Sequence, residues 1–182
     1  MTASHALPGF GDPAVGFDTP FDMLEACHER VLRSLALLQK LQDYLHDHPC
    51  DDSARQAARD VLRYFDMAAP LHHEDEELHV FPPLLERGGA DTVAAVRQLQ
   101  QDHEAMSANW QAARALLQAL AEGAQESFSA ADEAVLARFA GVYAEHIRLE
   151  EDLVYPAARA LLAPEAAQAM GAEMRRRRGA AG

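Results

Sequence analysis

The sequence has only two cysteines among 182 residues, Cys27 and Cys50. They form no Cys-x-x-Cys motif, and two cysteines in a chain of this length do not make a disulfide scaffold, so we expect a reducing compartment. Basic residues are also scarce, with 16 Lys and Arg against 29 Asp and Glu and a formal charge of −13. This charge repels polyphosphates and anionic membrane surfaces, and we therefore expect no binding to nucleic acid.

The sequence also lacks long apolar runs. No segment comes near the roughly 20 apolar residues that cross a bilayer, since Asp, Glu or Arg interrupts every candidate. The stretch from Met1 to Pro20 has neither a basic n-region nor a continuous apolar core, so it does not resemble a signal peptide. We therefore expect a cytoplasmic protein with no membrane partner, and a length that fits one globular domain.

Apolar residues recur at intervals of three and four in four long segments, with almost no alternation of the kind typical of strands. This periodicity predicts an all-α protein, and four helices of about 25 residues joined by short loops predict an antiparallel up-down-up-down four-helix bundle. The expected helices cover residues 19–45, 52–78, 92–122 and 129–155, with Pro70 bending the second, Asp91 capping the third, and prolines 82, 83 and 156 ending the second and fourth. The expected division is a lead-in over 1–18, the bundle over 19–156 and a short helical, frayed tail over 157–182.

The second and fourth predicted helices end in the same pattern, H-x3-E-E-x2-V-[FY]-P. It covers residues 72–82 and recurs 74 residues later, over 146–156. An offset of 75 also places Cys27-His28-Glu29 on Asp102-His103-Glu104. The chain is therefore a repeated helical hairpin. Packing of the two hairpins about a pseudo-twofold axis brings one His from each leading helix and one His-x3-Glu pair from each trailing helix around a common centre.

These residue types predict a metal site. Positions i and i+4 lie on one face of a helix, roughly 6 Å apart at Cβ, so one ion can contact both members of a His-x3-Glu pair. Imidazole nitrogen and carboxylate oxygen without thiolate favour iron, and are compatible with manganese, zinc or copper. Four His and two Glu exceed the needs of one tetrahedral zinc ion but suit two ions that share Glu76 and Glu150 and keep a position open.

The residues from about Asp18 to Pro156 resemble the hemerythrin-like, or HHE cation-binding, family. This resemblance implies a non-haem di-iron centre inside the bundle, with two iron ions joined by an oxo or hydroxo bridge. It also implies that dioxygen, nitric oxide or peroxide binds at an open iron position. By position, it implies six metal ligands: His28, His72, Glu76, His103, His146 and Glu150.

Two departures separate the sequence from the oxygen-carrying hemerythrins. Those carriers have two His four residues apart on the third helix, whereas Leu99 and Ser107 flank His103 at that spacing. They also have His-x4-Asp on the fourth helix, where this chain has His146-x3-Glu150, as in bacterial sensor-like and iron–sulfur repair relatives. The missing imidazole leaves a position open to water or to a neighbouring side chain, with three candidates: His73, His46 and Glu104.

Reversible oxygen carriage is therefore not the function we expect. The leading hypothesis is a binding or sensing protein, because no pair of nucleophile and base is visible beyond the ligands. The alternative is an enzyme that scavenges peroxide or nitric oxide or delivers iron for cluster repair, and a third hypothesis is iron storage or transfer. The sequence does not decide between binding and catalysis, and it does not indicate the oligomeric state.

A ferritin-like di-iron site is a weaker alternative. Glu25-x-x-His28 and Glu76-x-x-His79 match the Glu-x-x-His pair of such bundles, but the third and fourth predicted helices contain no such pair. Other neighbouring residues have structural explanations: packing at helix ends for Phe81 and Tyr155, and charge complementarity to a helix C-terminus for the basic run 175–178. The residues considered for hydrogen bonds to ligand imidazoles are Asp75, Glu77 and Glu151.

Overall fold

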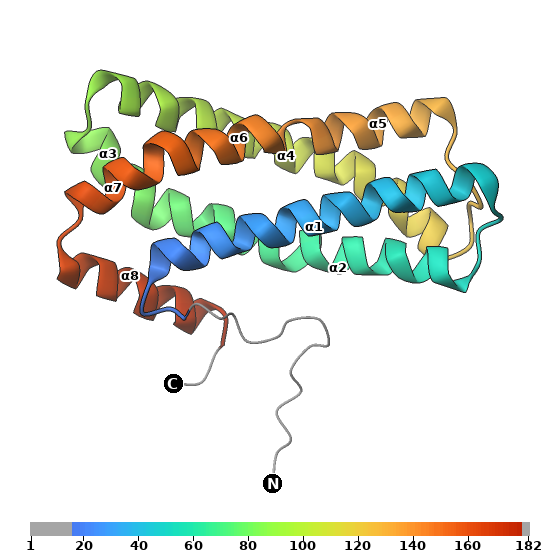
Figure 1. Ribbon diagram of the computed structural model, residues 1–182, viewed down its shortest axis with the longest axis horizontal. Coiled ribbons are helices and arrows are strands. Elements are labelled where there is room, and N and C mark those ends of the chain that lie inside the picture. The colour runs from blue at the N-terminus through green and yellow to red at the C-terminus, as the bar shows by residue number, and fades with distance from the viewer. Residues whose placement is uncertain (1–15, 180–182) are drawn as a thin grey trace, which may run out of the picture.

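The computed structural model describes residues 16–179, and over these residues the protein is helical without any strand (Figure 1). The prediction of an all-α protein is confirmed. In chain order the helices are α1 (Pro20–Asp47), α2 (Asp52–Asp75), the π-helical segment η1 (Glu76–Val80), α3 (Phe81–Arg87), α4 (Ala90–Ala121), α5 (Ala130–Gly141), α6 (Tyr143–Leu149), the π-helical segment η2 (Glu150–Val154), α7 (Tyr155–Leu161) and α8 (Pro164–Arg177).

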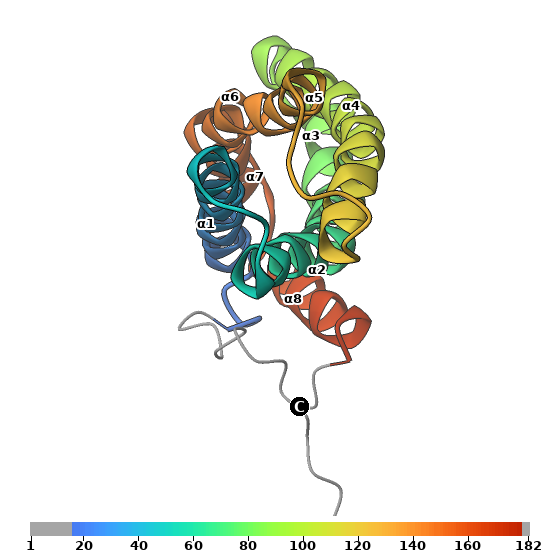
Figure 2. The ribbon, with the colours of Figure 1, turned by 90° about the vertical axis from the view of Figure 1, so that its right-hand side faces the viewer.

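Consecutive helices join into longer arms. One arm consists of α2, η1 and α3, another consists of α5, α6, η2 and α7, and α1 and α4 are arms by themselves. The arms surround a common interior, with α1 packed on α2, α2 on α4 and α4 on α5 (Figure 2). Helix α8 lies outside this bundle and contacts α1. The tail over 157–182, expected to be short, helical and frayed, contains a fifth packed element, a helix of 14 residues.

The helices begin close to the predicted residues, whereas their caps differ from the prediction in two of three cases. The side chain of Asp51 accepts a hydrogen bond from the Ala54 amide and caps α2. Thr19 precedes α1, but its hydroxyl donates to the Gly16 carbonyl and does not cap the helix. The predicted Asp91 cap is wrong, because α4 begins at Ala90. Gly89 takes the capping position with an extended backbone.

The prediction that prolines end the second and fourth arms is also wrong, since α3 continues to Arg87 and α7 to Leu161. In a regular helix, proline clashes with the carbonyl four residues earlier and has no amide hydrogen to donate. Here each proline lies in the first turn of an α-helix that follows a π-helical segment. The amides of Phe81 and Tyr155 bond to carbonyls five residues back, and this wider turn makes room for the proline that follows.

Buried apolar residues form two clusters, one around Phe65 and Phe139 and the other around Phe81 and Val154. Helix α1 contributes to both, with Val31 in the first and Leu24 in the second. His28 lies between these two positions, and the buried polar residues of the protein occupy the layer between the clusters. No helix within residues 16–179 is long and apolar enough to cross a membrane.

Helix α8 packs through small and flexible apolar residues. Met170 and Met174 are buried in the cluster around Phe81. Between them, Gly171 lies so close to Phe17 that a Cβ atom would be 1.9 Å from the Phe17 carbonyl oxygen. A glycine is therefore required where the chain that leads into α1 crosses α8. The remainder of the predicted lead-in, residues 1–15, and residues 180–182 lie outside the described part of the chain.

Candidate metal centre

The two π-helical segments begin at the glutamates that the repeat singles out. Glu76 is the first residue of η1 and Glu150 the first residue of η2, and both side chains are fully buried. Such segments insert one extra residue into a helical turn and are frequent at functional sites. The repeat therefore conserves a backbone irregularity as well as the side chains, and the [FY]-P at its end is the sequence feature that accompanies it.

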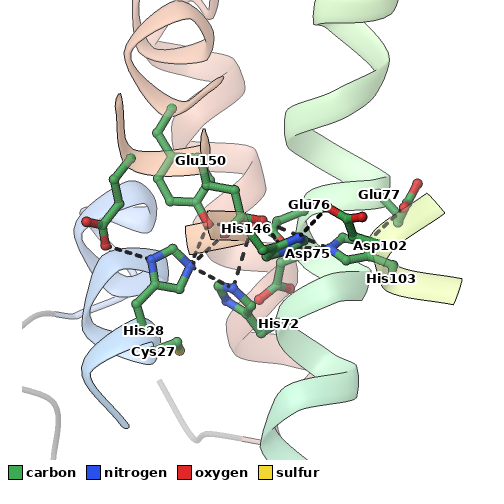
Figure 3. A network of polar contacts seen from close by, with 12 residues as sticks. Cys27, His28, His72, Asp75, Glu76, Glu77, Asp102, His103, His146 and Glu150 are labelled. Carbon is green, nitrogen blue, oxygen red and sulfur yellow. Dashed lines mark hydrogen bonds and ion pairs between the residues drawn. The ribbon is translucent and has the colours of Figure 1, made fainter. Parts of the chain in front are cut away.

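Helices from all four arms bring the six predicted ligands into the layer between the apolar clusters. Figure 3 shows the imidazoles pointing towards the two glutamates. Their ligand atoms form two groups of four within 4.8 Å of one another, and both groups contain Glu76 and Glu150. The first group adds His28 and His72, and the second adds His103 and His146. The structure thus assembles the six residues, with two glutamates common to two pairs of imidazoles.

The contact distances follow the same division. On one side, His28 Nε2 lies 3.1 Å from Glu150 Oε2 and 3.1 Å from His72 Nε2. His72 Nε2 lies 3.6 Å from Glu76 Oε1. On the other side, His146 Nε2 lies 2.8 Å from Glu150 Oε1, and His103 Nε2 lies 3.4 Å from Glu76 Oε2. Each glutamate therefore presents one oxygen to each pair of imidazoles, which is the arrangement needed to bridge two ions.

The outward-facing nitrogens of the two leading-helix histidines contact the second glutamate of each repeat. His28 Nδ1 lies 2.7 Å from Glu151 Oε1, and His103 Nδ1 lies 3.0 Å from Glu77 Oε1. A carboxylate that accepts the Nδ1 hydrogen fixes the ring and leaves Nε2 free to bind a metal. The roles considered for Glu77 and Glu151 are confirmed.

The role considered for Asp75 is wrong. Its fully buried carboxylate pairs with the guanidinium groups of Arg177, the last residue of α8, and of Arg178, which follows it. The basic run therefore does more than complement a helix dipole, since it neutralises a buried charge one residue before Glu76. Nearby, Glu173 of α8 contacts His79 of η1 at 2.8 Å.

Burial and mutual contacts shift the pKa values of the site. Burial and the charge of Glu150 raise the pKa of Glu76 to about 7. Burial lowers the pKa of His72 well below its usual value. Burial acts in the same direction on His28, but its contacts with Glu150 and Glu151 outweigh this effect and raise the pKa to about 9. The contacts with Glu150 and Glu151 therefore favour positive charge at His28 in the metal-free protein.

Several buried polar atoms of the site lie near one another but form no hydrogen bond of normal geometry, and this observation tests whether the residues fit a metal. The unpartnered atoms include Oε2 of Glu76, both side-chain oxygens of Glu150, and Nε2 of His103 and His146. Buried groups of this kind normally have partners, because leaving one unsatisfied costs about 1–3 kcal/mol. All of these atoms face the common centre and belong to the predicted ligands. The donor set fits one or two cations that imidazole and carboxylate groups can bind.

The three candidates for the missing imidazole occupy different places. His46 is exposed and pairs with Glu133 at 2.9 Å, outside the metal-binding groups. Glu104 is exposed and lines a surface hollow. Only His73 belongs to a group of possible ligands within the described residues, together with His103 and His146.

Sequence reasoning missed the role of Tyr155, which it assigned to packing at a helix end. The hydroxyl of Tyr155 donates to Glu76 Oε1 and lies 3.2 Å from His28 Nε2. Its ring stacks on His28, with centroids 5.6 Å apart. Phe81 occupies the equivalent position of the other repeat and stacks on His103 at the same centroid separation. The aromatic position within the repeated motif was the signal for this role.

Comparison with known proteins agrees with this site. Residues 19–158 match the family model described as the hemerythrin HHE cation binding domain. A protein of Haemophilus influenzae, described as uncharacterized, is 35% identical over 162 residues, which cover 89% of this chain and 91% of that protein. The family match covers most of the chain and contains the repeated half-sites and both π-helical segments. The chain therefore belongs to the hemerythrin HHE cation-binding family.

Proposed function

We propose that the protein binds two iron ions through His28, His72, Glu76, His103, His146 and Glu150, and that it binds or senses dioxygen, nitric oxide or peroxide at an open iron position. The observation that carries this proposal is the pair of overlapping four-residue groups that share both buried glutamates. One tetrahedral ion would leave part of this donor set unused, whereas two ions bridged by carboxylates use all of it. We further propose that the four arms have the antiparallel up-down-up-down topology of a four-helix bundle.

In this proposal, the bound iron supplies redox chemistry and an open coordination position. The chain's own residues supply the surroundings. Glu77 and Glu151 hold the Nδ1 hydrogens of His103 and His28 and so orient both rings. The Tyr155 hydroxyl holds a proton next to Glu76 Oε1, inside the buried layer. The apolar clusters on either side of the layer limit the access of water.

The first experiment measures iron per chain by elemental analysis after aerobic purification, together with the visible spectrum before and after reduction. We expect close to two irons and an absorption that reduction removes. The double variant Glu76→Gln/Glu150→Gln should lose both ions. The matched control His46→Ala changes an exposed histidine outside the site and should retain both. One zinc ion, or no metal and a flat spectrum, would contradict the proposal.

The same sample separates binding from catalysis. Nitric oxide or peroxide added to the loaded protein should be bound with a fixed stoichiometry and should not be consumed in repeated turnovers. Consumption faster than that by an equal amount of free iron would favour the enzyme hypothesis. Rapid loss of iron to a chelator would favour storage or transfer.

A further inference from the structure

A hollow lies within the apolar cluster around Phe65, next to the layer that contains the predicted metal ligands. Three arms each place one lining residue three positions from the predicted histidine ligand of that arm: Ala69, Met106 and Tyr143. The hollow has a volume of about 190 Å³. An apolar cavity of about 150 Å³ takes up benzene. This hollow therefore has room for a molecule with a single ring.

Two of the residues that line the hollow are smaller than their counterparts in the repeat. Ala69 corresponds to Tyr143 at an offset of 74, and Ser107 corresponds to Leu32 at an offset of 75. The small side chains of Ala69 and Ser107 leave space that a tyrosine and a leucine would occupy. The repeat itself thus indicates which substitutions would fill the hollow.

Aromatic side chains from three arms form the apolar walls of the hollow. The ring centroid of Phe65 lies 5.2 Å from that of Trp110 and 5.7 Å from that of Tyr143. The thioether of Met106 lines the same space. Contacts of a ring with other rings and with sulfur add to the free energy gained by apolar burial. These walls therefore favour an aromatic ring over an aliphatic chain.

Two polar groups that line the hollow have no partner. No hydrogen bond or ion pair within residues 16–179 involves the Tyr143 hydroxyl or the His73 ring nitrogens, although only 3% of Tyr143 is exposed. Buried polar groups normally have a partner, because leaving one unsatisfied costs free energy. A hydroxyl on a ligand both donates and accepts a hydrogen bond and would therefore suit either group.

The charges around the hollow favour a neutral ligand. Asp66 is the only carboxylate that lines it within the described residues. This carboxylate accepts hydrogen bonds from Trp110 Nε1 at 3.0 Å and from Arg114 Nε at 2.9 Å, so its charge is already balanced. The formal charge of −13 on the chain disfavours an anion. Neither a cation nor an anion would therefore find an unpaired opposite charge here.

We propose that this hollow binds a small neutral phenol, with its ring between Phe65, Met106 and Trp110 and its hydroxyl bonded to the hydroxyl of Tyr143. The phenol would lie beside His73, whose ring stacks on His103 at a centroid distance of 4.1 Å. The site is thus adjacent to the candidate metal centre but uses none of its six predicted ligands. The inference does not depend on metal binding.

The fluorescence of Trp110 provides the test, because Trp110 is the sole tryptophan of the chain and lines the hollow. The purified full-length protein is titrated with phenol and with benzene, with excitation at the long-wavelength edge of indole absorption, where neither compound absorbs. Both should give a saturable change, and phenol should bind about tenfold more tightly, the effect of one hydrogen bond. The absence of a saturable change with phenol would overturn the inference.

Tyr143→Phe tests the hydrogen bond separately from the apolar space. This variant should bind phenol about tenfold more weakly and benzene with unchanged affinity, because only the hydroxyl is removed. Equal phenol affinity in the wild-type chain and in Tyr143→Phe would overturn the assigned contact. A parallel loss of benzene binding would show a change in the hollow itself and would also contradict it.

Ala69→Leu and Ser107→Leu, made singly, fill the hollow and should weaken the binding of both compounds. Ala112→Leu is the matched control, since it enlarges an exposed alanine of α4 that does not line the hollow. Unchanged phenol affinity in both filling variants would overturn the inference. Phenol binding that disappears when a chelator removes the metal would place phenol on the metal and would also overturn it. A chain that binds phenol without containing metal would contradict only the proposed function.

Discussion

The two hairpins of the protein contribute the same residue types to the centre, but the Nδ1 atom of each leading-helix histidine contacts a glutamate of the other hairpin. Glu151 of the second hairpin contacts His28 of the first, and Glu77 of the first contacts His103 of the second. The aromatic residues follow the same crossed arrangement, with Tyr155 stacked on His28 and Phe81 on His103. A single hairpin therefore lacks the partners that orient its imidazole, and the centre forms only where the two hairpins pack together.

The hairpins differ at positions next to the ligands. The first has His73, Asp75 and Phe81 where the second has Ile147, Leu149 and Tyr155. Each difference has a structural consequence: an extra imidazole beside His103, a buried anchor for α8, and a hydroxyl present in only one half. The duplicated residues are the histidines and glutamates of the candidate metal centre, and the diverged residues make its two sides unlike.

The largest expected effect is the decrease in thermal stability when the metal is removed. This change tests both halves at once. A ligand present at a thousandfold above its Kd stabilises the fold by about 4 kcal/mol. In a chain of this size that corresponds to about 8–16 °C in Tm. Metal-free protein should therefore melt lower by about this amount in differential scanning calorimetry. Equal melting temperatures with and without metal would contradict a buried site formed on folding.

Single ligand variants compare the two sides. His72→Ala and His146→Ala should lose iron to a similar extent, because the repeat relates these two residues and each belongs to one of the two overlapping groups. Elemental analysis after dialysis against a chelator measures the loss, and a variant that retained both ions while the other lost them would argue against related half-sites.

The next prediction concerns Asp75, the buried carboxylate that anchors α8 and is present only in the first hairpin. Arg177→Met/Arg178→Met leaves the buried Asp75 carboxylate without its partners. Removing one side of a buried ion pair destabilises by about 3–5 kcal/mol, and we expect about 3 because both guanidinium groups are partly exposed. Urea unfolding of the metal-free protein measures this change. Arg176→Met on the exposed face of the same helix is the matched control and should change stability by less than about 0.5 kcal/mol.

A smaller change in stability is expected at Tyr155, whose hydroxyl is absent from the equivalent Phe81 of the other hairpin. Tyr155→Phe makes the second hairpin like the first and leaves Glu76 Oε1 without the hydroxyl that donates to it. We expect a loss of about 1–3 kcal/mol in the metal-free protein, as for other buried acceptors that lose a partner. The control is urea unfolding of Tyr143→Phe. This variant removes a hydroxyl that has no hydrogen-bond partner within residues 16–179. Equal effects of the two variants would show that the contact with Glu76 adds no stability.

The sequence predicts the helices and the six clustered residues because both depend on spacing. Apolar periodicity identifies the helices, and the repeated His-x3-Glu places Glu76 beside His72 and Glu150 beside His146 on their faces. The π-helical segments could not be predicted in this way, because an argument from residue spacing assumes a regular α-helix. The prolines after them were therefore interpreted as helix ends, although each follows a wider turn that accommodates it.

Contacts between distant segments could not be predicted from spacing. The pairing of Asp75 with Arg177 joins residues 102 positions apart, and only the packed position of α8 brings them together. The Tyr155 hydroxyl meets Glu76 across the two hairpins for the same reason. His73 is intermediate: its sequence position next to His72 made it a candidate, but the stack with His103 is a property of the packed arms.

Metal affinity should rise with pH, because a proton must leave His28 before its Nε2 can bind an ion. The contacts with Glu150 and Glu151 outweigh the effect of burial and raise the pKa of His28 to about 9, so this ring is protonated in the metal-free protein at pH 7. A raised pKa stabilises the metal-free fold below the ordinary value of about 6.5, and this contribution is lost as the pH rises through about 9. Each proton released should change the affinity about tenfold per pH unit.

Glu151→Gln and Glu77→Gln test this linkage separately in each half. Each removes the carboxylate that contacts the Nδ1 of one leading-helix histidine, at 2.7 Å for His28 and 3.0 Å for His103. Both variants should release fewer protons on binding metal, and Glu151→Gln should show the larger decrease because its contact is shorter. Titration calorimetry in two buffers of different ionisation enthalpy counts these protons. An unchanged count in both variants would mean that the outer carboxylates orient the rings without holding their charge.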